Sequence, residues 1–324
     1  MSVLLFAEQS EGSFKKATFE AATYAYDLAQ QLGGDLHAVA VGPVNDDALQ
    51  GLGSYGVSKV HTVGNDRLDA FVNTAYAAAV SAVAKQIDAK AVVMAQTYNG
   101  RAISPRVAVK LDAAPISGVI NMVEPNDGFK AQRMSYSGKG VESFAVKSDK
   151  VVITVKTNSY KIEEHPVDVS VEAFSFQPSE NDFGAVAKEI VKASSGISLT
   201  EADSVVSAGR GMKGPENWPM IEQLAELLGA ATACSKPVSD MEWRPHHEHV
   251  GQTGIQIAPN LYIAIGVSGA IQHLAGVSSS KTIVVINKDP EAPFFKIADY
   301  GIVGDLFEVV PQLIEAVKSA RATA

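Results

Sequence analysis

The chain has 324 residues, a formal net charge of -9 and an isoelectric point near 5.3. Hydrophobic residues make up 46% of it and charged residues 19%, so it can bury a sizeable core and is not expected to be disordered. The acidic balance argues against a surface for nucleic acid or for an anionic membrane, and no apolar run is long enough to span a bilayer. The length suggests two domains.

Cysteine usage and the first residues bear on the compartment. The single cysteine, Cys234, leaves no internal disulfide, which fits a reducing compartment. The first twelve residues, MSVLLFAEQSEG, lack the basic flank and the long apolar stretch of a signal peptide, so they are interpreted as a first strand. We therefore expect a cytoplasmic protein that does not insert into a membrane and does not bind nucleic acid.

Strands and helices alternate in the first third of the chain. Short apolar runs predict strands at 3–7, 36–41, 57–63 and 91–95. Helical periodicity predicts helices at 15–32, 69–87 and 101–111. We expect Gly33-Gly34 to end the first helix and Pro105 to lie in the first turn of the third. This alternation predicts a parallel sheet covered by helices on both faces.

The pattern changes after Pro115. Strands are predicted at 118–123, 129–135, 141–146 and 151–155. Turns alone separate them, so antiparallel pairs at the edge of the first sheet are expected. Residues 163–178 are expected to be extended, and Ser194-Ser195-Gly196, within 190–203, is the best linker candidate. The predicted domains are therefore 1–195 and 196–324.

A second α/β unit follows the linker. Strands are predicted at 204–208, 231–234, 261–265, 283–286 and 300–303. One predicted helix carries Ile221, Leu224 and Leu228 on its buried stripe, and a short one spans 270–275, with Gly276 as its stop. The closing helix is expected to begin near Val309, because Pro311 would disrupt a helix interior. The fold class is thus α/β, with a doubly wound second domain.

Polar or glycine-rich turns recur at the strand ends of the second unit. They are Gly209-Arg210-Gly211, Ser235-Lys236, Gly251-Gln252-Thr253-Gly254, Ser268-Gly269 and Asn287. Ligands of open α/β sheets bind beyond the carboxyl ends of the strands, and a helix that opens on Ser-Gly suits a phosphate. Each turn alone is more readily explained as an ordinary connection. Together they predict one binding site.

A second constellation, His246, His247 and His249 with Glu248, raises the possibility of a metal site. Adjacent histidines in a proline-bearing loop seldom converge in the geometry that a metal requires. A solvated loop that flanks the binding site is the preferred interpretation. The sequence contains no phosphate-gripping GxxxxGK[ST] loop.

Residues 261–289, LYIAIGVSGAIQHLAGVSSSKTIVVINKD, carry a resemblance to a known family. Together with the following PEAPFFKIADYGIVGDLFEVVP, they resemble the signature of the electron transfer flavoprotein α subunit family. The resemblance is close over about the last third of the chain and looser before it. It implies a first domain that docks a β subunit and a second domain that holds FAD in an extended form.

The resemblance also implies roles for individual residues. Arg210 would contact the flavin, Ser235 and Lys236 would lie beside the isoalloxazine ring, and the Thr253 hydroxyl would meet flavin N5. The segment before Thr253 would flank the ring, and the turn and helix after the third strand would lie near the pyrophosphate and the ring. The residues of these two segments are His249, Val250, Gly251 and Gln252, and Ser268, Gly269, Ala270, Ile271, Gln272 and His273. Asn287, Lys288 and Asp305 would contact the adenosine end.

Two of these residues have further consequences. His273 would lie near the flavin C2 carbonyl, where a donor or a cation favours the negative charge of the reduced ring. Without the resemblance, a buried core or capping histidine would explain His273 equally well. Lys236 stands where the family leads us to expect arginine, so the charge is kept but the planar fork is lost.

The resemblance implies an electron carrier rather than an enzyme with an organic substrate of its own. Such a heterodimer takes electrons from acyl-CoA dehydrogenases of fatty acid β-oxidation and passes them to electron transfer flavoprotein-ubiquinone oxidoreductase. One alternative is a superfamily variant that serves nitrogen fixation or carnitine metabolism with other redox partners. Another is a nucleotide-binding scaffold without redox function.

Overall fold

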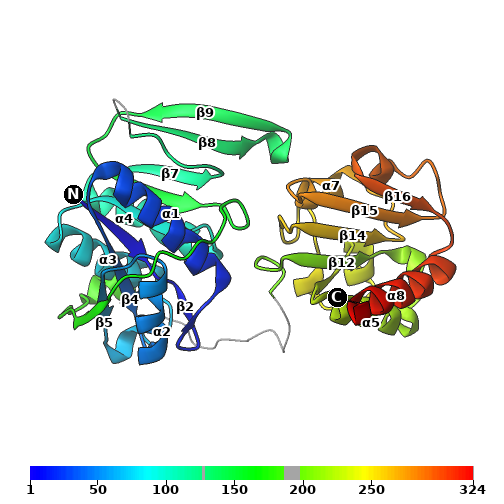
Figure 1. Ribbon diagram of the computed structural model, residues 1–324, viewed down its shortest axis with the longest axis horizontal. Coiled ribbons are helices and arrows are strands. Elements are labelled where there is room, and N and C mark those ends of the chain that lie inside the picture. The colour runs from blue at the N-terminus through cyan, green and yellow to red at the C-terminus, as the bar shows by residue number, and fades with distance from the viewer. Residues whose placement is uncertain (126–127, 186–197, 324) are drawn as a thin grey trace. The chain divides into compact units, whose positions relative to one another are not determined.

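The computed structural model describes residues 1–125, 128–185 and 198–323, and it divides into two compact units (Figure 1). The first unit is Met1–Ser135 with Gly140–Val191, and the second is Tyr136–Lys139 with Lys192–Ala324. The predicted linker, Ser194-Ser195-Gly196, lies outside the described residues, as does the predicted boundary after residue 195. That boundary stays a prediction.

In the described part of the chain, the first unit is built on a nine-stranded sheet in the order β11-β5-β4-β1-β6-β10-β7-β8-β9. Its strands are β1 (Ser2–Phe6), β4 (Asp35–Val41), β5 (Lys59–Val63), β6 (Ala89–Ala95), β7 (Ala114–Val119), β8 (Phe129–Ser135), β9 (Gly140–Val146), β10 (Val151–Val155) and β11 (Ser170–Ala173). A small hairpin joins β2 (Gln9–Ser10) to β3 (Ser13–Phe14).

The direction of the strands confirms a parallel sheet with antiparallel edge strands. Strands β11 to β7 run parallel, whereas β8 is antiparallel to β7 and β9 is antiparallel to β8. The expectation that all four strands after Pro115 would form antiparallel pairs is wrong for β10. That strand lies between β6 and β7 and is parallel to both, because its five buried residues are covered on both faces of the sheet.

Helices cover both faces of this sheet (Figure 1). They are α1 (Lys16–Leu32), α2 (Asp46–Gly51), α3 (Asn73–Gln86) and α4 (Tyr98–Leu111). Side chains alternate along a strand, so Val3 and Leu5 of β1 join the core formed with α1 and α2, whereas Leu4 and Phe6 join the core formed with α3 and α4. A helix layer on each side therefore keeps β1 almost fully buried.

Local capping explains where the helices begin and end. Helix α1 ends as predicted, because Gly33 adopts the left-handed conformation with φ of 62°. Helix α4 begins at Tyr98 rather than at residue 101, because the Thr97 hydroxyl accepts a hydrogen bond from Gly100 N at 2.9 Å. Pro105 consequently lies inside α4, so its predicted place in the first turn is wrong.

The second unit contains a five-stranded parallel sheet in the order β13-β12-β14-β15-β16. Its strands are β12 (Ser204–Ala208), β13 (Ala231–Cys234), β14 (Leu261–Ile265), β15 (Thr282–Asn287) and β16 (Tyr300–Val303). The chain runs from β12 outward to β13 and then returns to β14 on the other side of β12. The topological switch of this doubly wound sheet is therefore between β12 and β14.

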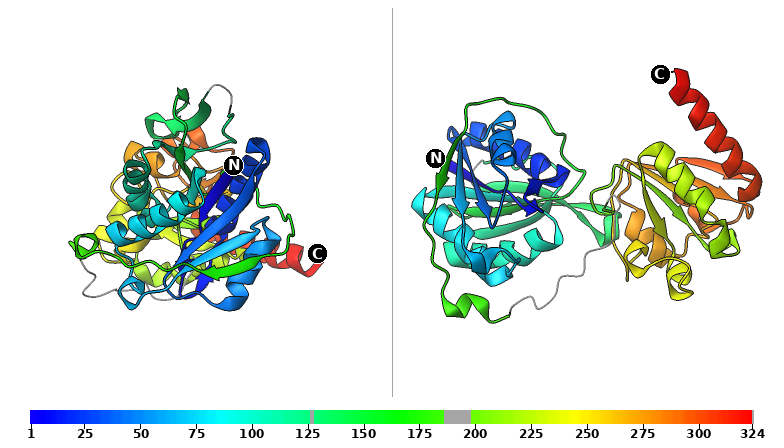
Figure 2. Two further views of the ribbon diagram at one scale, coloured as in Figure 1. Left: turned by 90° about the vertical axis from the view of Figure 1, so that its left-hand side faces the viewer. Right: turned by 90° about the horizontal axis from the view of Figure 1, so that it is seen from below.

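Helices α5 (Pro219–Leu228), α6 (Lys236–Asp240), α7 (Ile271–Val277) and α8 (Leu306–Thr323) belong to the second unit. Helices α5 and α8 pack together on one face of the sheet (Figure 2), where Val310 and Ile314 are buried. The other face packs against α7 and Phe294. In the described part of the chain, no helix combines the length and the apolar character that crossing a membrane requires.

Two predicted helix limits in this unit are wrong. Helix α8 begins at Leu306 and contains Pro311, because the Asp305 carboxylate accepts a hydrogen bond from Phe307 N at 2.9 Å and caps the first turn. Gly276 lies inside α7 and does not stop it. A Cβ on Gly276 would lie 2.5 Å from the Cα of Gly251, so this glycine permits a close approach of two backbones.

Candidate functional site

The turns that follow β12 and β14 lie against one another at the topological switch. Gly209 N donates to Ile265 O at 3.0 Å, and Gly211 N donates to Gly266 O at 3.2 Å. A Cβ on Gly209 would lie 2.4 Å from Gly266 O, so the two turns can meet only as bare backbone. Between the two glycines of the first turn, Arg210 is exposed at the carboxyl end of the sheet.

The turn after β14 is held from two sides. The Asn287 side chain donates to Val267 O at 3.0 Å, and Phe294 N donates to Ser268 O at 3.2 Å. Gly269 has a φ of 82°, and a Cβ there would lie 2.5 Å from Phe294 N. Strand β15 and the segment before β16 thus fix the turn that leads into α7, and Ser268 remains exposed.

His273 lies in α7, with 7% of its surface exposed. Its Nε2 is 2.8 Å from the hydroxyl of Tyr262 in β14, and its Nδ1 is buried without a hydrogen-bond partner among the described residues. Burial, with a smaller contribution from nearby His249, lowers the pKa of His273 to about 4. At neutral pH His273 is therefore an uncharged imidazole with one unused nitrogen.

The segment 249–254 bridges the end of β13 and helix α7. Val250 N donates to Cys234 O at 3.1 Å, and Gln252 N donates to Gln272 O at 2.7 Å. His249 is 2% exposed, and its Nδ1, like that of His273, is buried without a partner in the described part of the chain. Both unused nitrogens therefore belong to the histidines of the predicted site, whereas the side chains of Gln252 and Thr253 are exposed.

An ion pair that the sequence analysis did not assign anchors this segment. The Arg244 guanidinium donates to both carboxylate oxygens of Glu248, at 2.8 and 2.6 Å, and to Glu222 at 2.7 Å. Glu248 also accepts a hydrogen bond from Thr232 of β13 at 3.2 Å. Because Glu248 is buried and precedes His249, the pair fixes the approach to the buried imidazole.

Lys236 begins α6 just after β13. Its ammonium is 3.0 Å from the Asp240 carboxylate one turn later, and both side chains are more than half exposed. The charge of Lys236 is thus partly balanced within its own helix. The neighbouring Ser235 is buried.

The residues predicted for the adenosine end also hold local structure. Asn287 accepts a hydrogen bond from Asp289 N at 3.1 Å, besides donating to the turn after β14. Asp305 caps α8. Lys288 is exposed beside them. Their predicted ligand contacts would have to coexist with these structural bonds.

The structure therefore places every predicted site residue at the carboxyl end of the second sheet or in segments bonded to it. Their contacts with a cofactor remain predictions. Two partners were missed, Tyr262 and Arg244, and Glu248 was considered only as a possible metal ligand. The alternation along β14 places Tyr262 on the face opposite Leu261 and Ile263, but no spacing rule connects a strand residue with His273 in the following helix.

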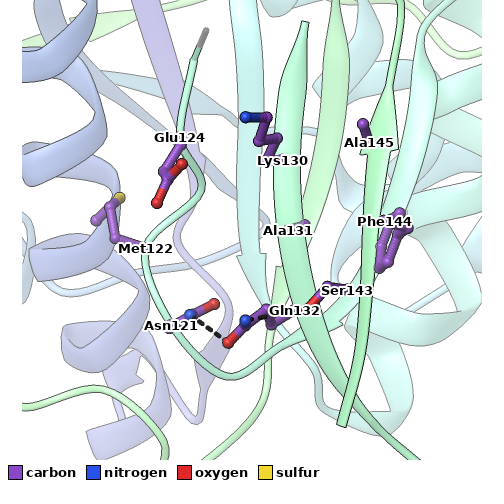
Figure 3. A pocket seen from close by; sticks show the side chains of 9 residues that line it. All are labelled: Asn121, Met122, Glu124, Lys130, Ala131, Gln132, Ser143, Phe144 and Ala145. Carbon is purple, nitrogen blue, oxygen red and sulfur yellow. Dashed lines mark hydrogen bonds between the residues drawn. The ribbon is translucent and has the colours of Figure 1, made fainter.

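A hollow of about 350 Å³ lies elsewhere, in the first unit (Figure 3). It is lined by Asn121, Met122, Glu124, Lys130, Ala131, Gln132, Ser143, Phe144 and Ala145. The Asn121 amide donates to Gln132 at 2.8 Å, and Gln132 donates to Ser143 at 3.0 Å, so these polar groups satisfy one another. None of the lining residues is among the predicted site residues.

The fold and the residues at the carboxyl end of the second sheet define a class of protein. It is an α/β protein whose doubly wound second unit is a nucleotide-cofactor domain. Glycine backbones at the switch and two buried, unused imidazole nitrogens suit an extended cofactor with polar groups along it. Residues 3–192 match the electron transfer flavoprotein domain, and residues 198–278 match the electron transfer flavoprotein FAD-binding domain.

Full-length relatives agree with this match. The chain is 37% identical to electron transfer flavoprotein subunit alpha of Bacillus subtilis (strain 168), over 98% of this chain and 97% of the relative. It is 38% identical to the protein of that name from Pseudomonas aeruginosa, over 98% of this chain and 100% of the relative. The chain belongs to the electron transfer flavoprotein α subunit family, and FAD is the cofactor of its second unit.

Proposed function

We propose that this chain is the α subunit of a cytoplasmic heterodimer that carries electrons in fatty acid β-oxidation. It takes electrons from acyl-CoA dehydrogenases and passes them through FAD to electron transfer flavoprotein-ubiquinone oxidoreductase. The observation that carries the proposal is the pair of buried imidazoles, His249 and His273. Each keeps an unused nitrogen beside the turn of the second sheet where cofactors of such folds bind.

Within this proposal the chain's own residues bind and tune the cofactor. FAD, when bound, supplies the capacity to accept and return electrons. The exposed Arg210 and Lys236 would contribute positive charge near the ring, and the exposed Thr253 would offer it a hydroxyl donor. The turn from Ser268 into α7 would hold the pyrophosphate, and His273 would serve the ring carbonyl. Asn287, Lys288 and Asp305 would bind the adenosine end.

The first test concerns the cofactor and the partner. The chain is produced together with its β subunit, the purified complex is denatured, and the released chromophore is identified. We expect one FAD for each α chain. Release of FMN, or of no flavin after refolding with FAD, would overturn the proposal at its base.

The second test concerns the redox partners. The FAD-loaded complex is mixed with an acyl-CoA dehydrogenase that has been reduced by its substrate, and flavin absorbance is followed. We expect reduction of the complex, followed by reoxidation when the quinone-linked oxidoreductase is added. A complex that holds FAD but exchanges electrons with neither protein would refute this assignment of partners and would favour a superfamily variant.

A further inference from the structure

Three histidines of the second unit lie in series between the surface and the core. His246 is exposed, and its ring centroid is 5.6 Å from that of the buried His249. The Cβ position of Gly251 lies 3.5 Å from His249 Nε2 and 3.7 Å from the Cα of His273. The backbone of Gly251 therefore lies next to the His249 ring and to the backbone of His273, and Nε2 of His273 meets the Tyr262 hydroxyl.

The two inner imidazoles each have a nitrogen without a partner. The Nδ1 atoms of His249 and His273 are buried without hydrogen-bond partners among the described residues, as is Nε2 of His165 in the first unit. An unsatisfied polar atom inside a protein costs free energy, so it calls for a functional explanation. An imidazole that must gain and lose a proton needs such a vacant nitrogen.

We propose that His246 and His249 form a proton route from solvent to the cofactor site, and that His249 takes up one proton when the site gains an electron. This inference rests on the proposed function. The electron comes from the reduced donor protein, and the proton comes from bulk water through His246. One negative and one positive charge enter together, and both leave when the electron passes to the acceptor.

The groups around His249 suit this role. After burial, His246 disfavours the charged imidazole most, Lys236 on α6 also disfavours it, and Asp240 on α6 favours it. Burial is the largest influence, and the pKa of His249 lies below its ordinary value, so the ring is neutral at pH 7. A new negative charge in the adjoining site would raise that pKa, because it favours the charged imidazole.

The test compares the parent complex with H249Q, which keeps a polar side chain but cannot titrate. Spectroelectrochemical titrations from pH 5.5 to 8.5 give the flavin potential at each pH. In the pH range where His249 binds a proton on reduction, the equilibrium constant for one-electron reduction should depend on pH more steeply in the parent than in H249Q. The difference should be up to tenfold per pH unit. This difference corresponds to about 59 mV for one electron.

Nuclear magnetic resonance of histidine-labelled protein supplies a direct second readout. The pKa of His249 should be higher in the reduced complex than in the oxidised complex. Equal pH slopes in the parent and H249Q, or an unchanged pKa of His249, would overturn the proposal. Because FAD content is measured in every sample, this failure is distinct from a failure to bind FAD.

The passage of the proton through His246 can be tested against a matched control, His247. His247 is exposed like its neighbour His246 but is not the ring paired with His249. We expect H246Q to slow proton uptake after rapid reduction several-fold, with the pH dependence of the potential unchanged, and H247Q to behave like the parent. Equal slowing in both variants, or in neither, would overturn the role of His246.

Discussion

At the scale of single residues, the first prediction concerns Lys236, which we propose lies near the flavin and raises its reduction potential. A positive charge beside the ring favours the reduced, more negative state, so K236M should lower the midpoint potential. The side chain is exposed and paired with Asp240, which weakens the effect. We expect a fall of a few tens of millivolts, below about 59 mV for one electron, in a spectroelectrochemical titration.

Two further variants test whether the potential follows the charge at this position. D240N removes the balancing carboxylate, so the potential should rise, whereas K236R keeps the charge and should change it less. All three proteins must hold FAD fully before they are compared. An unchanged potential in K236M at low ionic strength would remove Lys236 from the flavin environment.

His273 links the stability of the second unit to pH. Its folded pKa of about 4 is below the ordinary value of 6.5, so the unfolded chain binds the proton first as the pH falls. The contribution of the neutral imidazole is complete above pH 6.5 and is lost progressively toward pH 4. It amounts to about 3 kcal/mol of unfolding free energy.

Tryptophan fluorescence can follow this loss, because both tryptophans, Trp218 and Trp243, belong to the second unit. Urea unfolding of flavin-free protein should show that the parent loses more stability than H273Q between pH 7.5 and 5. The glutamine amide lies near the position of histidine Nε2, so it can bond to Tyr262, but it does not titrate in this range. Parallel losses in the two proteins would contradict the assignment of this pH dependence to His273.

At the scale of elements, the sequence predicted the strands of the second unit better than its helix limits, whereas in the first unit the strand predicted at 118–123 is observed as β7 at Ala114–Val119. The apolar runs of β12, β13, β14 and β16 end at glycine or polar turns, and the observed bounds agree with the predicted ones. The starts of α4 and α8 depend on single capping side chains, which outweigh the prolines inside both helices. The position of β10 depends on pairing with distant strands, which no local pattern encodes.

At Gly276 in α7, the structure predicts whether replacing the glycine by alanine stabilises or destabilises the protein. Alanine in place of glycine inside a helix usually stabilises it by up to about 1 kcal/mol. In G276A, however, the new methyl group would lie 2.5 Å from the Cα of Gly251, so the 249–254 segment must move. We expect a loss of about 1–3 kcal/mol of unfolding free energy, measured by tryptophan fluorescence, and weaker FAD binding.

Gly51, the last residue of α2, is the matched control. A Cβ on Gly51 would have no neighbour within 4 Å, so G51A should be neutral or slightly stabilising, as measured by circular dichroism. If G276A were as stable as the parent and bound FAD equally well, the contact between α7 and the 249–254 segment would not be needed.

At the scale of the whole molecule, the sequence predicted which residues belong to the candidate site but not the contacts between them. Glycine-rich strand ends and the family signature identified the carboxyl end of the second sheet. The sequence could not show that His273 meets Tyr262, or that Arg244 holds the segment before His249, because these contacts join separate elements. Nor could it show that Asp305 and Asn287 already hold turns in place.

The last prediction is that the chain requires its β subunit to be stable and loaded with FAD. Each residue of the edge strand β16 is exposed, and Tyr300 and Val303 show 67% and 59% of their surface. At the start of α7, Ile271 is 64% exposed. An apolar strand at the open edge of a sheet invites aggregation unless a partner or charged residues protect it.

Expression of the chain alone should therefore give aggregated or flavin-poor protein, and co-expression with the β subunit should give a monodisperse, yellow 1:1 complex in gel filtration. I302K tests the edge itself, because a lysine on an edge strand suppresses strand-to-strand association. V109K, on the exposed face of α4, removes one exposed valine from the first unit and leaves the edge of β16 unchanged. If β16 causes the aggregation, I302K should make the lone chain more soluble and V109K should not. A lone chain that is monodisperse and fully loaded with FAD would contradict the requirement for a partner.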